Sequence, residues 1–303
     1  AGRVVAMEIL RTPESRFEAI DDYPYEPVWR QWEGMNLAHV DEGEGPPVLL
    51  LHGEPTWGYL WRKVMGPLLE AGYRCVVPDL PGFGRSDKPA DDAWFTMERL
   101  TGSIAGLVDE LGLADATLVC HDWGGPIGLA VAAVQRPEAF GRLVAMDTGV
   151  FNGHQKMGEN WQRFLAFIES NPDVMVELPI QGGAATELTP EVLAAYAAPF
   201  PDVASKAGVR ALPPLIPQSP DAPGAALGQE TMERLLADRR PHLLLWADSD
   251  PALPLDPVGR LVQLLFPNAE PLTVIESAGH FLQEDQGERI GRLIAEWLRG
   301  LGV

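Results

Sequence analysis

The stretch Val119–Gly125, which reads VCHDWGG, says more about the fold than any other part of the chain. Apolar residues lead into a tight turn that carries an acid, and a helix-like segment follows over residues 126–134. The spacing small–x–nucleophile–x–small between a strand and a helix is typical of a turn that presents a nucleophile. Asp122 occupies the position where serine is usual. A carboxylate attacks an sp³ carbon bearing a leaving group without help from a base, and it leaves an ester that water must hydrolyse.

Outside this turn, short apolar runs rich in β-branched residues alternate with longer helical patterns. This alternation predicts an α/β fold, with a mostly parallel sheet flanked by helices. We expect strands at residues 47–51, 74–78, 116–121, 143–146, 242–246 and 272–275. We expect helices at residues 57–71, 97–111, 230–238, 256–266 and 288–301.

The alternation stops between residues 150 and 228, where proline, alanine and aromatic residues dominate. Helical pieces are expected near residues 160–170 and 191–198. Apolar residues occur throughout this segment, so we expect it to pack on the rest of the protein rather than act as a linker. The chain therefore divides into a first core part over 1–149, an inserted helical cap over 150–228 and a second core part over 229–303.

The chain is acidic, with a formal net charge of −20, and its 303 residues are 46% hydrophobic. A chain of this length and composition can bury a sizeable core. Nucleic acids and anionic membranes are both recognised by clustered lysine and arginine. We therefore expect neither nucleic acid nor membrane as a partner.

The only two cysteines, Cys75 and Cys120, lie in strand-like runs, so no disulfide framework is expected. No Cys/His pair has metal-ligand spacing, and we predict neither a metal nor a cofactor. Residues 1–6 lack the long apolar run of a signal peptide, and no segment approaches the roughly 18 apolar residues of a membrane span. The predicted location is the cytoplasm.

Hydrolysis of an ester on Asp122 needs a base to activate water, and histidine has a pKa near the working pH. The chain has six histidines, and His280 follows the last predicted strand. That is where the base falls in the chain order nucleophile, acid, base. His52 and His121 stand at strand-end turns beside the site, and we assign both to hydrogen bonds with loop backbone.

An acid must fix the tautomer of His280 and stabilise its imidazolium form. Asp250 lies in the loop after the penultimate predicted strand, and Asp147 follows the strand after the nucleophile helix. Either loop can reach a histidine at the carboxyl edge of the sheet. We favour Asp250, keep Asp147 as the alternative and assign Asp248 to a turn.

The first core strand is followed by HGEPTW at residues 52–57. In this architecture a backbone N–H from that loop and the N–H after the nucleophile form an oxyanion hole. Here those groups belong to Glu54 and Trp123, and they would hold the oxyanion formed when water attacks the ester. The Trp123 indole, a donor without an acceptor, would stabilise a departing halide if it lies beside the attacked carbon, and is otherwise a core aromatic.

Together these motifs resemble the haloalkane dehalogenases of the α/β-hydrolase superfamily, and the resemblance covers nearly the whole chain. Glu54, Trp123 and the YAAPFPD motif point to the branch whose acid follows the penultimate strand, which supports Asp250. The glycine and nucleophile-turn motifs are shared with epoxide hydrolases. The matching stretches are HGEPTW at 52–57, PGFGRSDKP at 81–89, HDWGG at 121–125, YAAPFPD at 196–202, DP at 250–251 and AGHFLQED at 278–285.

The resemblance implies a small halogenated alkane and water as substrates, and no cofactor. In a first step Asp122 displaces halide, which is held by Trp123 and by a second donor from the cap. In a second step water attacks the Asp122 ester and releases an alcohol, with His280 as base and Asp250 as the orienting acid.

The second halide donor is where the chain departs from the family pattern. The branch uses a cap tryptophan, and we place that position at Phe164. Phenylalanine has no N–H, and its positive ring edge faces an anion only weakly. Trp161, one helical turn away, is the alternative donor.

Two other functions remain open from the sequence. An epoxide hydrolase would use the same Asp–His–Asp residues, with cap tyrosine hydroxyls to protonate the epoxide oxygen. The cap segment contains one tyrosine, Tyr196, which lies in the YAAPFPD motif. A ligand-binding member of the fold would retain these residues with little turnover.

Overall fold

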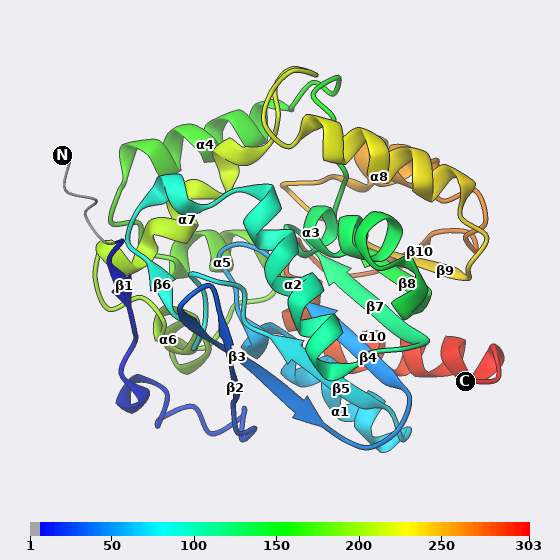
Figure 1. The fold of residues 1–303 in the computed structure, drawn as a ribbon, viewed down its shortest axis with the longest axis horizontal. Helices are drawn as coiled ribbons and strands as arrows, with labels where there is room; N and C mark the ends of the chain where they lie inside the picture. The colour runs from blue at the N-terminus through cyan, green and yellow to red at the C-terminus, as the bar shows by residue number, and fades with distance from the viewer. Residues whose placement is uncertain (1–6) are drawn as a thin grey trace.

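An eight-stranded sheet runs through the centre of the protein in a computed structural model that describes residues 7–303 (Figure 1). Its strand order is β10-β9-β8-β7-β4-β5-β3-β2, parallel from β10 to β5 and antiparallel at the β3-β2 edge. The predicted α/β class is confirmed. Its strands are β2 (Val28–Trp32), β3 (Met35–Glu42), β4 (Pro47–Leu51), β5 (Arg74–Pro78), β7 (Ala116–His121), β8 (Phe140–Met146), β9 (His242–Ala247) and β10 (Thr273–Ile275). A separate short pair joins β1 (Ile9–Leu10) to β6 (Lys88–Pro89).

Helices cover both faces of the sheet. They are α1 (Arg62–Glu70), α2 (Met97–Leu111), α3 (Gly124–Ala130), α8 (Ala225–Ala237), α9 (Arg260–Gln263) and α10 (Leu282–Gly300). Successive strand residues point to opposite faces. In β4, Leu49 and Leu51 join a buried cluster with α2, α3 and α8, whereas Val48 and Leu50 join a second cluster with α1 and α10. Strands buried on both faces read as continuous apolar runs, which made the central strands recognisable in the sequence.

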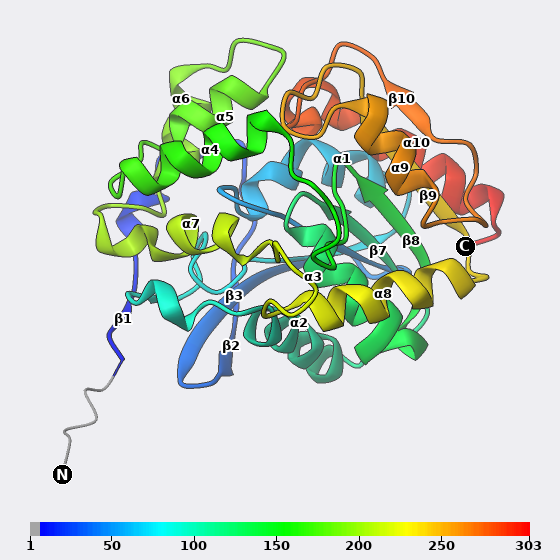
Figure 2. The ribbon, with the colours of Figure 1, turned by 90° about the horizontal axis from the view of Figure 1, so that it is seen from above.

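Four α-helices lie between β8 and α8, within the segment predicted to be a cap. They are α4 (Glu159–Ser170), α5 (Glu177–Gly183), α6 (Pro190–Ala197) and α7 (Ala207–Ala211). Figures 1 and 2 show them on one side of the molecule, away from the C-terminus. The predicted helices at 160–170 and 191–198 match α4 and α6, and α5 and α7 were not predicted. The predicted boundary at residue 228 falls inside α8.

Several predicted element boundaries were wrong. The first predicted helix opens with a 3₁₀ turn, Gly58–Trp61, and β8 begins at Phe140 rather than at residue 143. Helix α8 begins at Ala225 instead of residue 230. Helix α10 begins at Leu282, whereas the sequence predicted residue 288. The backbone kinks at Gln286, and the apolar periodicity on which the prediction rests is present only beyond this kink. Strands β2 and β3 were not predicted.

None of the helices within residues 7–303 is long and apolar enough to cross a membrane. The same residues contain no group of three or more His, Cys, Asp or Glu side chains arranged to hold a metal ion. Cys75 and Cys120 are both buried and free, as the sequence predicted. The prediction about a signal peptide concerns residues 1–6, which lie outside the described residues.

Candidate active site

The turn between β7 and α3 forces the nucleophile candidate into an unusual backbone conformation. Asp122 has a φ of +49°, in the left-handed region that few residues other than glycine adopt. Its neighbours fit tightly, since a Cβ on Gly124 would collide with the Leu51 carbonyl and one on Gly125 with the Thr148 hydroxyl. That hydroxyl donates to the Asp122 carbonyl oxygen at 2.6 Å. The left-handed turn and these close contacts together hold the Asp122 side chain at the carboxyl end of the sheet.

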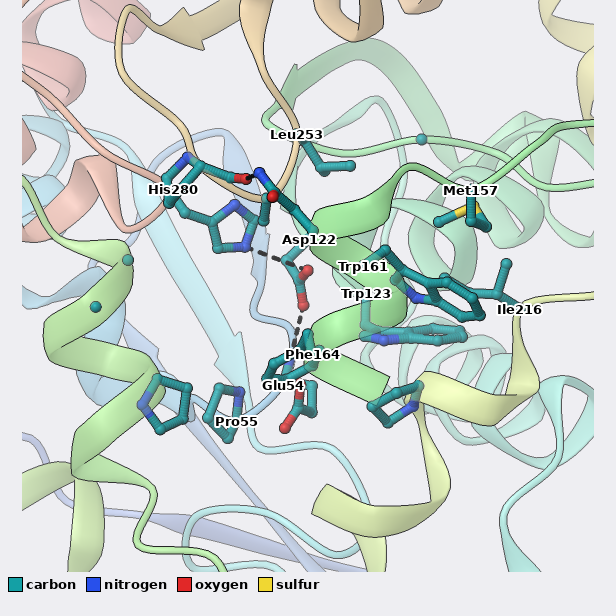
Figure 3. A pocket seen from close by; sticks show the side chains of 18 of the residues that line it. Glu54, Pro55, Asp122, Trp123, Met157, Trp161, Phe164, Ile216, Leu253 and His280 are labelled. Atoms are coloured by element: carbon teal, nitrogen blue, oxygen red, sulfur yellow. Dashed lines mark hydrogen bonds and ion pairs between the residues drawn. The ribbon is translucent and has the colours of Figure 1, made fainter. Parts of the chain in front are cut away.

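The Asp122 carboxylate contacts both groups that the sequence assigned to it. Its Oδ1 accepts the Glu54 backbone N–H at 2.8 Å, and its Oδ2 lies 3.3 Å from Nε2 of His280 (Figure 3). The Trp123 backbone N–H also contacts the carboxylate. Burial raises the pKa of Asp122, but the hydrogen bond with His280 and its charge more than offset that effect, and the pKa falls below the usual 3.8. The side chain is therefore an anion held by two backbone donors and an imidazole.

His280 joins this carboxylate to a second one. Its Nδ1 lies 2.8 Å from Oδ2 of Asp250, a buried residue whose Oδ1 accepts the backbone N–H groups of Ala252 and Leu253. Burial raises the pKa of Asp250, but His280 lowers it to about 2 overall. Burial lowers the pKa of His280, but Asp250 and Asp122 raise it well above the usual value. The ring is thus flanked by two carboxylates.

Asp147, the alternative acid, has a different environment. It is fully buried, and its carboxyl accepts the Ala247 backbone N–H at 3.1 and 3.2 Å. Burial, and then the charge of Asp250, raises the pKa of Asp147 well above its usual value, and a hydrogen bond joins the two acids. Within residues 7–303 no hydrogen bond joins Asp147 to His280. The structure therefore brings Asp250, rather than Asp147, to the histidine ring.

The loop that carries His280, residues 277–281, is called the base loop here, and it is fixed by backbone hydrogen bonds. Asp248 accepts the N–H groups of Ser277 and Ala278 at 2.9 and 3.1 Å, as expected of a turn acid. His121 Nε2 lies 2.7 Å from the His280 carbonyl oxygen. Burial, and then the neighbouring His280, lowers the pKa of His121 to about 3, so its neutral ring donates from Nε2.

His52 also bonds loop backbone, so the roles assigned to both strand-end histidines are confirmed. Its Nδ1 lies 2.9 Å from the Gly53 carbonyl oxygen, and its Nε2 accepts the Leu80 N–H at 3.0 Å. A Cβ on Gly53 would collide with the Asp122 carboxylate and the Trp123 backbone nitrogen. Glycine at this position lets the loop after β4 approach the nucleophile.

A cavity of about 380 Å³ lies between the Asp122 carboxylate and the helices that follow β8 (Figure 3). Trp123 forms part of its wall, and α4 contributes Trp161 and Phe164. Both candidates for the second halide donor therefore face the cavity. The other apolar lining residues include Pro55, Met157, Ile216, Leu253 and Phe281. An apolar pocket with a few polar groups at one end is typical of a small-molecule site.

Glu54 contributes a carboxyl group to the same cavity, a feature that the sequence analysis did not use. The residue is only 5% exposed, and its Oε1 has no hydrogen-bond partner in the described part of the chain. Burial, and then the charge of Asp122, raises the pKa of Glu54 well above its usual value. Burial and the Asp122 charge therefore both favour the protonated, neutral form of the Glu54 carboxyl. The sequence did offer a signal for this group, since the HGEPTW motif places an acid in the loop that contacts the nucleophile.

Tyr196, the single tyrosine of the predicted cap, does not line this cavity. Its hydroxyl is buried and donates to Oε1 of Glu284 at 2.5 Å. Arg62 holds the same carboxylate with two hydrogen bonds, at 2.5 and 2.9 Å. The hydroxyl that an epoxide hydrolase would need in the pocket is thus engaged in a buried ion-pair network.

Comparisons with known proteins agree with this arrangement. The family model of the alpha/beta hydrolase fold matches residues 46–286. A haloalkane dehalogenase of Psychrobacter cryohalolentis is 39% identical over 96% of this chain and 98% of its own, and one of Mycolicibacterium paratuberculosis is 35% identical over 97% and 100%. Among solved structures, the tetrameric haloalkane dehalogenase DpaA of Paraglaciecola agarilytica superposes with a TM-score of 0.89 at 32% identity, over 95% of this chain and 97% of that one.

Proposed function

This chain belongs to the haloalkane dehalogenase family of the α/β-hydrolase fold, and we propose that it hydrolyses alkyl halides through an ester formed on Asp122. The hydrolase acts on carbon–halide bonds, and its substrates are a halogenated alkane and water. The observation that carries the proposed mechanism is the position of the Asp122 carboxylate. It faces the cavity with one oxygen against the Glu54 N–H and the other against His280.

In the first step, Oδ2 of Asp122 attacks the carbon that carries the halogen. The C–O bond forms as the carbon–halogen bond breaks, and the halide leaves with the bonding electron pair. Oδ1, held by Glu54 N–H, becomes the carbonyl oxygen of the ester. The low pKa of Asp122 supports this role, because the attacking carboxylate has to be ionised.

The departing halide needs N–H donors, and we propose the indoles of Trp123 and Trp161. Both line the cavity, and an indole donates one hydrogen bond without accepting any. Phe164, our placement of the family's second donor, lines the cavity as well but has no N–H. We therefore assign the second donor to Trp161.

In the second step, water attacks the Asp122 carboxyl carbon and gives its proton to Nε2 of His280. The backbone N–H groups of Glu54 and Trp123 hold the oxyanion. When the oxyanion collapses, the bond from the carboxyl carbon to the alkoxy oxygen breaks, and His280 returns the proton to the leaving alkoxide. The second proton of the water is left on the Asp122 carboxyl and is released, because the pKa of Asp122 is lowered. Asp250 keeps the ring in the tautomer that has its lone pair on Nε2.

Esterification also prepares His280 for this step. In the free enzyme the Asp122 carboxylate helps to raise the pKa of His280, which favours the protonated ring. The ester carries no charge, so the pKa of His280 falls when the alkyl group is attached. The base thus becomes available when the intermediate that needs it has formed.

The test is to replace His280 by phenylalanine and incubate the variant with 1-bromobutane. We expect the alkyl group to remain on the enzyme as a mass increase that peptide mapping assigns to Asp122. Halide release should stop after one equivalent. H154Q, at an exposed histidine, is the matched control and should accumulate no ester. Undiminished halide release by H280F without an adduct would contradict the mechanism.

Halide release from 1-bromobutane, measured beside diol formation from styrene oxide, separates the alternatives. An epoxide hydrolase would form a diol from styrene oxide and release little halide, whereas a ligand-binding protein would do neither.

We also propose that residues 150–228 form the cap, with 1–149 and 229–303 as the core, and that the protein works in the cytoplasm. Cell fractionation tests that location.

A further inference from the structure

The motif AGHFLQED at residues 278–285 supplies the base, but its last acid has a separate set of contacts. Asp285 lies in the first turn of α10, five residues after His280. Its Oδ2 accepts the Gly279 backbone N–H at 2.9 Å. Gly279 directly precedes His280, so the Asp285 carboxylate holds the base loop one residue away from the imidazole.

The same carboxylate binds the chain that follows α5. Its Oδ2 also accepts the Ala185 N–H at 2.9 Å, and its Oδ1 accepts the Thr186 N–H at 2.9 Å and the Thr186 hydroxyl at 2.6 Å. Three backbone donors and one hydroxyl thus converge on a single side chain. Since Pro179, Gly182 and Gly183 line the cavity, this link connects the pocket wall to the base loop.

Close packing makes the link tight. The Phe281 N–H donates to the Gly183 carbonyl oxygen at 3.4 Å. A Cβ on Gly279 would collide with that carbonyl, and one on Gly183 would collide with the Phe281 ring. The base loop and the end of α5 therefore pack directly against each other at Gly279 and Gly183, with no room for a side chain between them.

We infer that Asp285 is a positioning residue, which sets the place of His280 relative to the Asp122 ester and anchors the α5 end of the pocket wall to the same point. Without this carboxylate, the N–H groups of Gly279, Ala185 and Thr186 lose their acceptor together. The base loop then shifts by small amounts while the fold persists, because Asp248 and His121 still hold its other backbone groups.

The inference rests on the proposed base role of His280, and the two-step mechanism gives it a selective signature. Displacement of halide uses Asp122 and the indole donors, and it does not require an exact position of His280 Nε2. Hydrolysis of the ester does require it. Loss of the Asp285 contacts should therefore slow the second step and leave the first step nearly unchanged.

The experiment measures both steps in D285A and D285N with 1-bromobutane. We expect a rapid release of about one halide per enzyme, followed by steady release about tenfold slower than in the wild type, because small misplacement of a catalytic group costs up to roughly a hundredfold. Mass spectrometry should show most of the enzyme as the ester during turnover. D285N keeps one acceptor oxygen and should lie between the wild type and D285A.

E288A is the matched control, since Glu288 lies on the same helix and is exposed, and it should behave as the wild type. T186V removes only the hydroxyl contact, so it should slow hydrolysis less than D285A. The inference fails if folded D285A or D285N hydrolyses its ester at the wild-type rate, or if halide displacement slows by the same factor. If H280F traps the ester but D285A behaves as the wild type, only this inference is overturned. If H280F traps no ester, the proposed function itself is overturned.

Discussion

The Nδ1 atom of His280 lies 2.8 Å from Oδ2 of Asp250, and this contact fixes the tautomer of the ring. Asp250 is an anion, because its pKa is about 2, so Nδ1 carries the proton and donates it. Once Asp122 is esterified and Nε2 has lost its proton, the Nε2 lone pair is directed to the Asp122 side, where water has to be activated. Within the described residues the Asp147 carboxyl is hydrogen-bonded to Asp250 and to the Ala247 N–H, and not to the His280 ring.

The two acids should respond very differently to amide substitution. In D250N the ring loses the anion that selects its tautomer, and we expect ester hydrolysis to fall by about three to four orders of magnitude, as for a triad acid. In D147N the amide still donates to Asp250, as the neutral acid does, so kcat should stay within about threefold of the wild type. Steady-state halide release measures both. The reverse ranking would make Asp147 the working acid.

Trp161 should contribute to halide binding through its N–H. In W161F the aromatic packing is largely retained and the donor is lost, so bromide affinity should fall about 10- to 100-fold, the equivalent of one hydrogen bond to a charged group. Quenching of tryptophan fluorescence by bromide measures the affinity. W29F, at a tryptophan that is 40% exposed, controls for the loss of one fluorophore. Unchanged bromide binding by W161F would remove this residue from the halide site.

The two chemical steps should depend on pH in different ways. The lowered pKa of Asp122 keeps it ionised at neutral and mildly acidic pH, so the first release of halide should be flat between about pH 5 and pH 9. Ester hydrolysis needs neutral His280, whose pKa is still raised by Asp250 but falls when Asp122 is esterified, so that rate should increase as pH rises through the pKa of the ring in the ester. Rapid-quench measurement of the first turnover, beside steady-state rates, separates the steps. A first step that falls in acid together with the second would contradict this assignment.

Tyr196 should matter for stability rather than for catalysis. Y196F removes a buried donor from the Glu284 carboxylate, and we expect the free energy of unfolding to fall by about 1.5–3 kcal/mol. Urea denaturation measures it, with Y25F, at a partly buried tyrosine, as the control. KM for 1-bromobutane should stay within about twofold of the wild type, because the hydroxyl is outside the cavity. A large rise in KM would place Tyr196 in the substrate path after all.

The central strands could be predicted from the sequence because burial on both faces leaves a continuous apolar run. The bounds of β4, β5 and β7 match the prediction. The β2 edge could not be found this way, since Val28 and Trp29 are exposed and Arg30 is its buried residue. Edge strands with mixed polarity lack the pattern that marks a buried strand.

For the site, local motifs identified Asp122 and His280, because each lies at the end of a strand in a recognisable turn. The choice between Asp250 and Asp147 depends on which loop reaches the His280 ring, a tertiary distance that spacing along the chain does not encode. The contacts of Asp285 were missed for the same reason. Ala185 and Thr186 lie about a hundred residues before it, with no motif to pair them.

The left-handed backbone at Asp122 limits which substitutions can abolish the activity without disturbing the turn between β7 and α3. Asparagine tolerates that conformation about as well as aspartate does, whereas a β-branched residue is strongly disfavoured there. An amide in place of the carboxylate is also not a nucleophile. The D122N protein would therefore keep a cavity of about 380 Å³ and its indole donors, and would serve as a reversible sensor for halogenated solvents.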